Sequence, residues 1–512
     1  MTRSTAWRQI TPFFIYCIVS FSMADFIFGL DTSLFGGLQA LPGFLNVFGV
    51  PRPGKTPYLP TLRKSIMNSV VFLGRLFGVF CFEPLTERIG YRFLVVFIVG
   101  VQLVAVIIEI TSKEWIQFTI GRVISYMTIG FIEACVPSYS AEIAPPELRG
   151  FFSGMFVPIQ TAAGIWGTGM SRAFTNEQGR KGWMVPVGIQ FIPIVFTFGM
   201  IWFTVESPRW LISKGRHEEA LQNLKRLRPK EHTDDGLAEA EIEAMSQALE
   251  YDKSIKEAGW LELFSGSMWR RTVSVALMFF VYEAGGNQFS SAYGTTFFQS
   301  VGLASKSFTY NIVITLAGFI GAMVAITTTD KVGRRPLCII GSVSCVIWNV
   351  IVAVMGSKSD LSTADVNAVV ASFVLLVFST KVAFAIHSFI VTTEMGVMMV
   401  GASFDVLSSF LVTFCSPYIL AKIGAKIGYV FAAISFIGLV YAVLFLPELR
   451  GRSLEEVDEL FEKPRFRWGW QYEGVKTTGA GAAISQLEHT GHLDVEVEEV
   501  RMESDEKTNE KS

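Results

Sequence analysis

Residues 87–92 read Glu-Arg-Ile-Gly-Tyr-Arg, and residues 330–335 read Asp-Lys-Val-Gly-Arg-Arg. Each of these charged turns stands between two long apolar runs, so one local pattern occurs once in each half of the chain. A second pair of motifs repeats at nearly the same offset, since 205–209 read Val-Glu-Ser-Pro-Arg and 446–452 read Leu-Pro-Glu-Leu-Arg-Gly-Arg. The repetition predicts two related halves.

The apolar runs on either side of these turns are long enough to cross a bilayer, which takes about 20 mostly apolar residues. The 512-residue chain is 51% hydrophobic and only 17% charged, whereas soluble proteins carry about a quarter charged residues. We therefore predict an all-α membrane protein with twelve transmembrane helices in two pseudo-symmetric six-helix bundles. The expected spans are 12–38, 64–83, 91–110, 116–139, 150–173, 183–204, 271–300, 308–328, 336–356, 366–393, 402–421 and 427–446.

One long polar segment divides the spans six and six. It predicts an N-terminal bundle at 1–204, a linker at 205–270, a C-terminal bundle at 271–462 and a disordered, acid-rich tail at 463–512. Two stretches of the linker, 216–228 and 236–252, have the pattern of short amphipathic helices. Most of the 43 Lys and Arg residues fall in segments that lie inside if both termini are cytoplasmic, which predicts that orientation.

Composition and motifs argue against several functions. A net charge of −2 gives no basic surface for nucleic acid. The six cysteines are scattered through apolar segments, unlike a zinc site or a disulfide framework. Gly54-Lys55-Thr56 lacks the upstream glycine of an ATP-binding loop. We expect no enzyme activity, no metal and no cofactor, but a monomeric secondary carrier in the lipid bilayer whose site lies between the two halves.

Several ordered motifs carry a family resemblance. They are Gly-Leu-Asp-Thr at 29–32, the block from Gly121-Arg122 through 136–145 to Arg149-Gly150, Glu-Ser-Pro-Arg-Trp-Leu at 206–211 and the segment 447–461. Together they resemble the sugar porter family of the major facilitator superfamily, in its fungal form, from about residue 29 to 462. The resemblance implies alternating access and proton-linked transport of a small-molecule substrate, with a sugar or polyol as the first expectation.

Asp31 and Arg122 lie well inside apolar runs. A charge at the bilayer centre costs roughly 2.5–3.5 kcal/mol on insertion scales, so such residues usually face a cavity or a partner. The resemblance implies that Asp31 carries the proton and that Arg122 is its partner. The alternative is a static structural ion pair.

A further set of charged residues falls at the cytoplasmic ends of the expected spans. We expect these residues to pair across neighbouring helices and to close an inner gate, although interfacial charges that extend toward water would give the same pattern. The set comprises Glu87, Arg92, Glu142, Arg149, Glu206, Arg209, Asp330, Arg334, Arg335 and Glu394.

The substrate side departs from the family pattern. Tyr282 and Glu283 stand where the family has two sugar-binding glutamines, and Phe389 stands in place of a tryptophan. Amides suit a neutral polyol because each can donate and accept hydrogen bonds, so their loss weakens a plain hexose interpretation. The predicted pocket lining is Gln160, Glu283, Asn287, Gln288, Tyr293 and Phe389.

Lys381, His387 and Asp405 join Glu283 as charged or titratable residues in the second half, and they form a possible charged pocket. On one account Glu283 pairs with Lys381 and the substrate meets neither. On the other, the pocket accepts a charged or larger, partly aromatic solute. The alternatives to a sugar carrier are a carrier or exporter of a non-sugar metabolite, such as an organic acid or secondary product, and a transporter-like nutrient sensor. The expected location is the plasma membrane, with the vacuolar membrane as the alternative.

Overall fold

The computed structural model describes residues 10–145, 148–230, 236–254, 268–358, 362–394 and 398–448. Within these ranges the chain is almost entirely helical. A small antiparallel hairpin of β1 (Val50–Arg52) and β2 (Lys55–Tyr58) lies in the segment after the first long helix. The predicted all-α class is confirmed, whereas the predicted disordered tail lies outside the described residues.

The first half begins with α2, whose capping residue Thr11 accepts a hydrogen bond from the backbone of Phe14. The predicted second span begins in α4 and continues in α5, which also contains the third span and is interrupted at Gly90, where φ is 81°. A residue with a Cβ rarely adopts that conformation. The helices of this half are α2 (Pro12–Leu38), α3 (Pro42–Phe48), α4 (Thr61–Ser69), α5 (Val71–Ile110), α6 (Trp115–Ile143), α7 (Arg149–Gly154), α8 (Phe156–Ala173), α9 (Lys181–Gly188) and α10 (Phe191–Ile201).

The second half contains two spans that are interrupted by π-helical turns, η4 and η6. Such turns are frequent at functional sites. In η4 the backbone of Gly286 has a φ of 119°. The elements of this half are α15 (Met268–Tyr282), η4 (Glu283–Asn287), α16 (Gln288–Ser300), η5 (Ala304–Lys306), α17 (Ser307–Val332), α18 (Arg334–Gly356), α19 (Thr363–Thr380), η6 (Lys381–Ala385), α20 (Ile386–Glu394), α21 (Met398–Ile423), η7 (Gly424–Lys426) and α22 (Ile427–Leu444).

Eight helical segments of the described chain are long and apolar enough to cross a membrane. Two of them, Thr61–Ile110 with 50 residues and Val400–Leu444 with 45, are each long enough for two crossings. The more polar α8 and the interrupted α15–α16 segment supply the remaining two, which gives the predicted twelve. Large apolar side chains such as Phe93 and Phe203 remain exposed on the outside of the bundle, as a lipid-facing surface requires.

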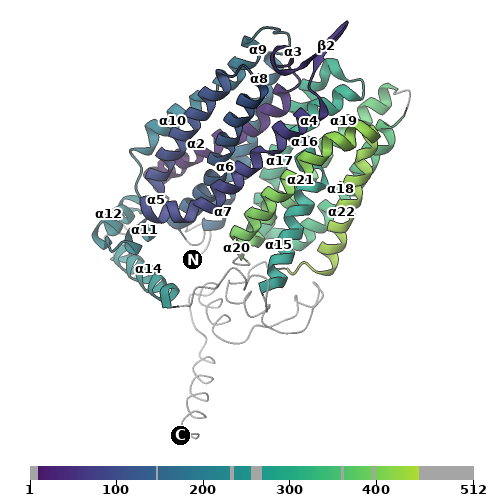
Figure 1. Ribbon diagram of the computed structural model, residues 1–512. Helices are drawn as coiled ribbons and strands as arrows, with labels where there is room; N and C mark the ends of the chain where they lie inside the picture. The colour runs from purple at the N-terminus through teal and green to yellow at the C-terminus, as the bar shows by residue number, and fades with distance from the viewer. Residues whose placement is uncertain are drawn as a thin grey trace.

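The two halves stand side by side, with α3 and the hairpin at one end of the molecule (Figure 1). Three short helices, α11 (Pro208–Ser213), α12 (His217–Leu227) and α14 (Leu237–Ser254), lie at the opposite end and share a small apolar core around Leu211 and Leu224. The last two coincide with the predicted linker helices. The halves meet where α8 packs on α17, α2 on α16, and α21 on α4 and α5.

Candidate functional site

A cavity of about 160 Å³ lies between the two halves. At 10–15 Å³ for each water molecule, it could hold on the order of ten waters. Side chains of α2, α5, α6 and α8 line it from the first half, and those of η4, α16, α17, η6 and α21 from the second. Among the residues predicted to bind substrate or to form a charged pocket, the lining includes Gln160, Glu283, Asn287, Gln288, Phe389, Lys381 and Asp405.

Two predicted pocket residues lie elsewhere. Tyr293 is buried beside α21, where its hydroxyl donates to the carbonyl of Thr413 at 2.8 Å. His387 is fully buried, with Nε2 3.2 Å from the hydroxyl of Thr329. Neither residue is part of the cavity lining. Their polarity suggested a pocket position, but each faces a neighbouring helix of its own half.

The side-chain amide of Gln160 can still donate a hydrogen bond to a solute in the cavity. Its amide nitrogen is buried and, among the residues that the structure describes, has no hydrogen-bond partner. The position depends on Gly29, because a Cβ there would lie 2.6 Å from the Cα of Gln160. The glycine of the 29–32 motif therefore lets α2 approach α8 closely enough to place Gln160 at the cavity wall.

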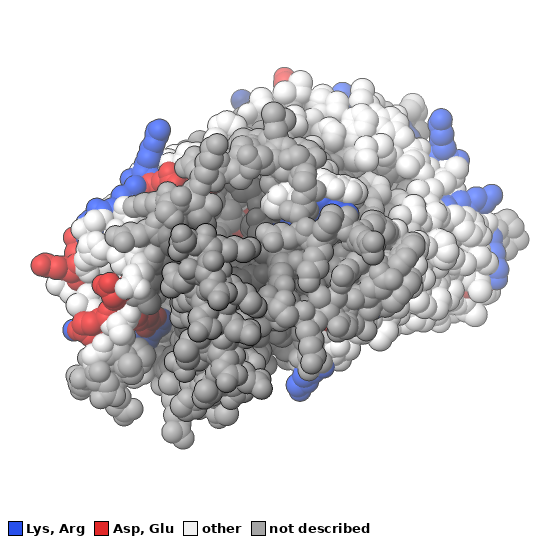
Figure 2. Space-filling view, turned by 90° about the horizontal axis from the view of Figure 1, so that it is seen from below, with Lys and Arg blue, Asp and Glu red and all other residues white. Residues whose placement is uncertain are grey.

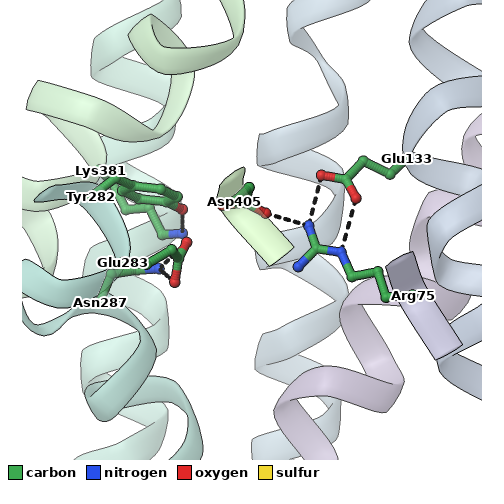
Figure 3. A network of polar contacts seen from close by, with 7 residues as sticks. All are labelled: Arg75, Glu133, Tyr282, Glu283, Asn287, Lys381 and Asp405. Atoms are coloured by element: carbon green, nitrogen blue, oxygen red, sulfur yellow. Dashed lines mark hydrogen bonds and ion pairs between the residues drawn. The ribbon is translucent and has the colours of Figure 1, made fainter. Parts of the chain in front are cut away.

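A buried group of three charges connects the two halves (Figure 3). The guanidinium of Arg75 donates to both carboxylate oxygens of Glu133, at 2.9 and 2.6 Å, and to Oδ2 of Asp405 at 2.5 Å. Arg75 and Glu133 belong to α5 and α6 of the first half, and Asp405 to α21 of the second. All three side chains line the cavity. Paired carboxylates neutralise a charge that would otherwise be costly at this depth.

Lys381 and Glu283 lie side by side in Figure 3 but make their hydrogen bonds to other groups. The Lys381 ammonium donates to the hydroxyl of Tyr282 at 2.9 Å. The Asn287 amide donates to the two oxygens of Glu283 at 3.2 and 3.3 Å. The π-helical turns η4 and η6 begin at Glu283 and Lys381 and bring both residues to the cavity. Glu283 and Lys381 therefore lie next to one another, and both line the cavity where a solute could contact them.

Asp31 and Arg122 lie close together with separate hydrogen-bond partners. Asp31 accepts a 2.6 Å hydrogen bond from Ser125 and is buried behind the cavity wall. Arg122 lines the cavity, where it donates to the carbonyl of Met67 at 3.0 Å and stacks 3.7 Å from the ring centre of Phe35. Their charges attract electrostatically without a direct hydrogen bond between these two described residues.

At the linker end of the first half, Glu206 caps a helix. Its carboxylate accepts hydrogen bonds from the backbone N–H groups of Tyr91, Arg92 and Ser207, at 3.0 to 3.1 Å. Burial raises the pKa of the Glu206 carboxyl, and these three N–H groups act in the opposite direction. Glu142 completes the cluster by accepting from the hydroxyls of Tyr91 and Ser207.

The second half repeats this arrangement. Glu448 accepts from the backbone N–H groups of Arg334 and Arg335, both at 3.0 Å, directly after Gly333 with a φ of 101°. The guanidinium of Arg335 also donates to the carbonyl of Val443 at 2.9 Å. The repeated sequence motifs are therefore repeated helix caps, each formed within one half.

The remaining residues of the predicted gate are only partly described. Glu87 and Arg209 are exposed at the same end of the first half, where the carbonyl of Glu87 accepts from the Trp210 indole at 3.2 Å. Arg92 donates to the carbonyl of Trp202 at 2.8 Å. The side chains of Arg149, Asp330 and Glu394 lie outside the described part of the structure. Seen from this end, many of the visible Lys, Arg, Asp and Glu side chains lie near the edge of the molecule (Figure 2).

Comparison with known proteins agrees with this geometry. Residues 16–461 match the family described as sugar (and other) transporter. The chain belongs to this family. Among the described residues of this transporter, no three His, Cys, Asp or Glu side chains are placed to hold a metal ion.

Relatives and solved structures support the assignment. The low-affinity glucose transporter HXT1 of Saccharomyces cerevisiae is 29% identical to the sugar transporter described here, over 92% of this chain and 86% of the yeast protein. The high-affinity hexose transporter HXT6 of the same yeast is 29% identical, over 89% and 82%. The xylose transporter XylE from E. coli, in a partially occluded inward open conformation, is similar in fold, with 16% identity, a TM-score of 0.71 and coverage of 86% and 99%.

The sequence did not single out Glu133 of this transporter. It lies in the middle of an apolar run in α6, as Arg122 does, and its charge alone could have marked it. Glu109 is a second buried acid that the sequence reasoning passed over; a Cβ at Gly121 would lie 2.8 Å from its Cγ atom. Arg75 also lies within an apolar run, but its two acidic partners come from other helices. No pattern of spacing along the chain connects the three.

Proposed function

We propose that the protein is a proton-coupled secondary transporter that moves a neutral polar solute, most favourably a sugar or polyol, by alternating access. The halves 1–204 and 271–462 are the two moving bodies, and the cavity between them is the substrate site. Both termini are cytoplasmic, so that the end with α3 and the hairpin faces outward. The protein acts as a monomer in the plasma membrane.

One observation carries the choice of a neutral solute. The buried Gln160 amide nitrogen has no partner among the described residues, and it shares the cavity lining with Asn287 and Gln288. A hydroxyl group can fill such a site because it accepts and donates at the same time. The Arg75 guanidinium, by contrast, is already bound by the carboxylates of Glu133 and Asp405.

The relatives point to the same class of solute. The yeast relatives are named as transporters of glucose and hexose, and a solved structure of similar fold is titled a proton:xylose symporter. For the proton, the family resemblance and the burial of Asp31 in a membrane span support this residue as the carrier and Arg122 as its partner.

Uptake in yeast that lacks its own hexose transporters tests the proposal. The panel consists of labelled glucose, xylose, maltose, inositol, quinate and lactate, each with and without a protonophore. We expect accumulation of one neutral solute that the protonophore abolishes. Failure to take up any neutral solute would contradict the proposal.

A second candidate is a carrier of a charged metabolite such as an organic acid. It is favoured by the charged side chains that line the cavity, which are Arg75, Arg122, Glu133, Glu283, Lys381 and Asp405. Uptake of quinate or lactate, with none of the sugars or of inositol, would support this candidate instead.

A further inference from the structure

The charges around Asp405 do not balance. In the group drawn in Figure 3, three carboxyls, those of Glu133, Glu283 and Asp405, face two basic groups, those of Arg75 and Lys381. Arg122 also lines the cavity, but its charge interacts with the acids Asp31 and Glu109. Lys381 is already hydrogen bonded to Tyr282. Asp405 uses one oxygen for Arg75, while its buried Oδ1 atom has no partner in the described chain. An excess acid inside a membrane protein requires a counter-charge or a proton.

The charged and titratable groups around Asp405 come from five neighbouring elements. Arg75 comes from α5 and Glu133 from α6, while Tyr282, Glu283 and Lys381 come from α15, η4 and η6. The other contacts of α21 with α4 and α16 include hydrogen bonds at Phe414 and Thr413. Those positions are more than two helical turns along α21 from Asp405, at 3.6 residues per turn.

The bond between Arg75 and Asp405 joins the two halves. At the end with α3 and the hairpin, three further hydrogen bonds hold the halves together. The Gln39 amide donates to the carbonyl of Ala292 at 2.5 Å, the Ser65 hydroxyl to that of Phe414 at 2.8 Å, and Arg172 to the hydroxyl of Thr309 at 3.0 Å. The structure therefore shows this end closed.

Opening this end must separate α21 from α5. Arg75 is then expected to stay with Glu133, because two hydrogen bonds within one half hold that pair and a single bond holds Asp405. Asp405 would be left with Glu283 and one ammonium, that of Lys381. A buried carboxylate without a partner is strongly unfavourable, and protonation relieves it.

We propose that Asp405 is a second proton-binding residue of the transport cycle. It takes a proton from outer water when the halves separate at the end with α3. When this end closes, the Arg75 guanidinium again pairs with Asp405, and the proton leaves for water in the cavity. This step rests on the proposed alternating access, but it is separate from Asp31 and does not depend on which solute is carried.

The opening of the outer end can be measured without a substrate. Leu62 on α4 and Lys422 on α21 are exposed on helices that pack together, so both can carry spin labels after replacement by cysteine. The two half-buried native cysteines, Cys81 and Cys415, are first changed to serine. Distances between the labels, measured across a range of pH in lipid nanodiscs, then report the ratio of open to closed protein.

Because the open state holds the extra proton, acid must favour it. The expected ratio of open to closed protein rises as pH falls, by up to about tenfold per pH unit for one proton. Asp405→Asn should be open more often than the parent protein at every pH and should show a smaller slope, because only other groups such as Asp31 can then contribute. Glu177→Gln, which changes an exposed acid outside the cavity lining, is the matched control and should keep the slope of the parent protein. A parent protein without a slope, or a slope in Asp405→Asn as large as that in Glu177→Gln, would each overturn the proposal.

A second variant keeps the proposal testable if Asp405→Asn misfolds. If Asp405→Asn does not elute as a single species in gel filtration, Arg75→Gln replaces it. Without the guanidinium nothing displaces the proton from Asp405 on closure, so we expect the slope to be smaller here too. A slope equal to that of the parent protein would again contradict the proposal. Failure of the sugar proposal would leave this measurement unaffected, since no solute is present.

Discussion

At the scale of single residues, the function depends on a few polar side chains that the membrane would otherwise exclude. Asp31 and Gln160 illustrate two different uses. Asp31 is held by Ser125 and lies out of the cavity, so it is suited to carry a proton. Gln160 reaches the cavity with an amide nitrogen that has no hydrogen-bond partner in the described chain, so it is suited to bind solute.

For Asp31, we predict that Asp31→Asn abolishes accumulation of solute against its gradient, because an amide cannot exchange a proton near neutral pH. Passive exchange of the same solute should continue, since the cavity lining is unchanged. The measurement compares protonophore-sensitive uptake with counterflow in proteoliposomes. Fully retained active transport would remove Asp31 from the mechanism.

For Gln160, we predict that Gln160→Ala raises the KM for the transported solute by about tenfold, the effect of losing one hydrogen bond worth about 1.5 kcal/mol. Initial rates across solute concentrations in cells give the value. The matched control is Gln178→Ala, which removes an exposed amide outside the cavity lining and should leave the KM unchanged. Equal KM values for both variants would show that Gln160 does not bind the solute.

At the scale of the elements, each half uses the same device to start a helix after a charged turn. A glycine with positive φ reverses the chain, and a carboxylate from the end of the half caps the next helix. Gly90 and Glu206 do this in the first half, and Gly333 and Glu448 in the second. The cap satisfies N–H groups that a helix terminus leaves free and places negative charge at its positive end.

We predict that Gly90→Ala lowers the thermal stability of the purified protein, because a Cβ there would lie 2.6 Å from a carboxylate oxygen of Glu206 and would require a φ of 81°. A backbone conformation of this kind costs on the order of 1–3 kcal/mol for other residues. Gly199→Ala is the matched control, since a Cβ there meets nothing within 4 Å. Melting curves in detergent measure both, and an equal melting temperature would exclude the cap as a source of stability.

The sequence predicted the elements better than the contacts between them. The first span, 12–38, coincides with α2, because a long apolar run with Pro12 at its start leaves little freedom in where the helix begins. The π-helical turns at Glu283 and Lys381 were not predicted, because an added residue only shifts the phase of a helical pattern, and that shift is hard to detect in spans that are apolar on most faces. For the same reason the sequence could place Lys381 near Glu283 but could not show that Tyr282 takes its hydrogen bond.

At the scale of the whole molecule, a few hydrogen bonds and helix packing among the described residues hold the two halves together at the end with α3. Side chain to backbone bonds across this interface each contribute about 0.5–1.5 kcal/mol, so a single change can shift the balance between open and closed states severalfold. Gln39 is well placed for such a test. Its amide binds the other half through the carbonyl of Ala292 and also accepts from Asn68.

We predict that Gln39→Ala exposes the cavity to the outside more often. A cysteine in place of Thr32, which lines the cavity, should then react up to about tenfold faster with a membrane-impermeant maleimide added outside cells, in a background without Cys81 and Cys415. Asn46→Ala is the matched control, because its amide bonds to the carbonyl of Gln178 within the first half at 3.0 Å. That change should leave the labelling rate at the parent value. If Gln39→Ala labels no faster than Asn46→Ala, the bond to Ala292 does not hold the outer end closed, and closure must rest on the packing of α21 against α4 and α5.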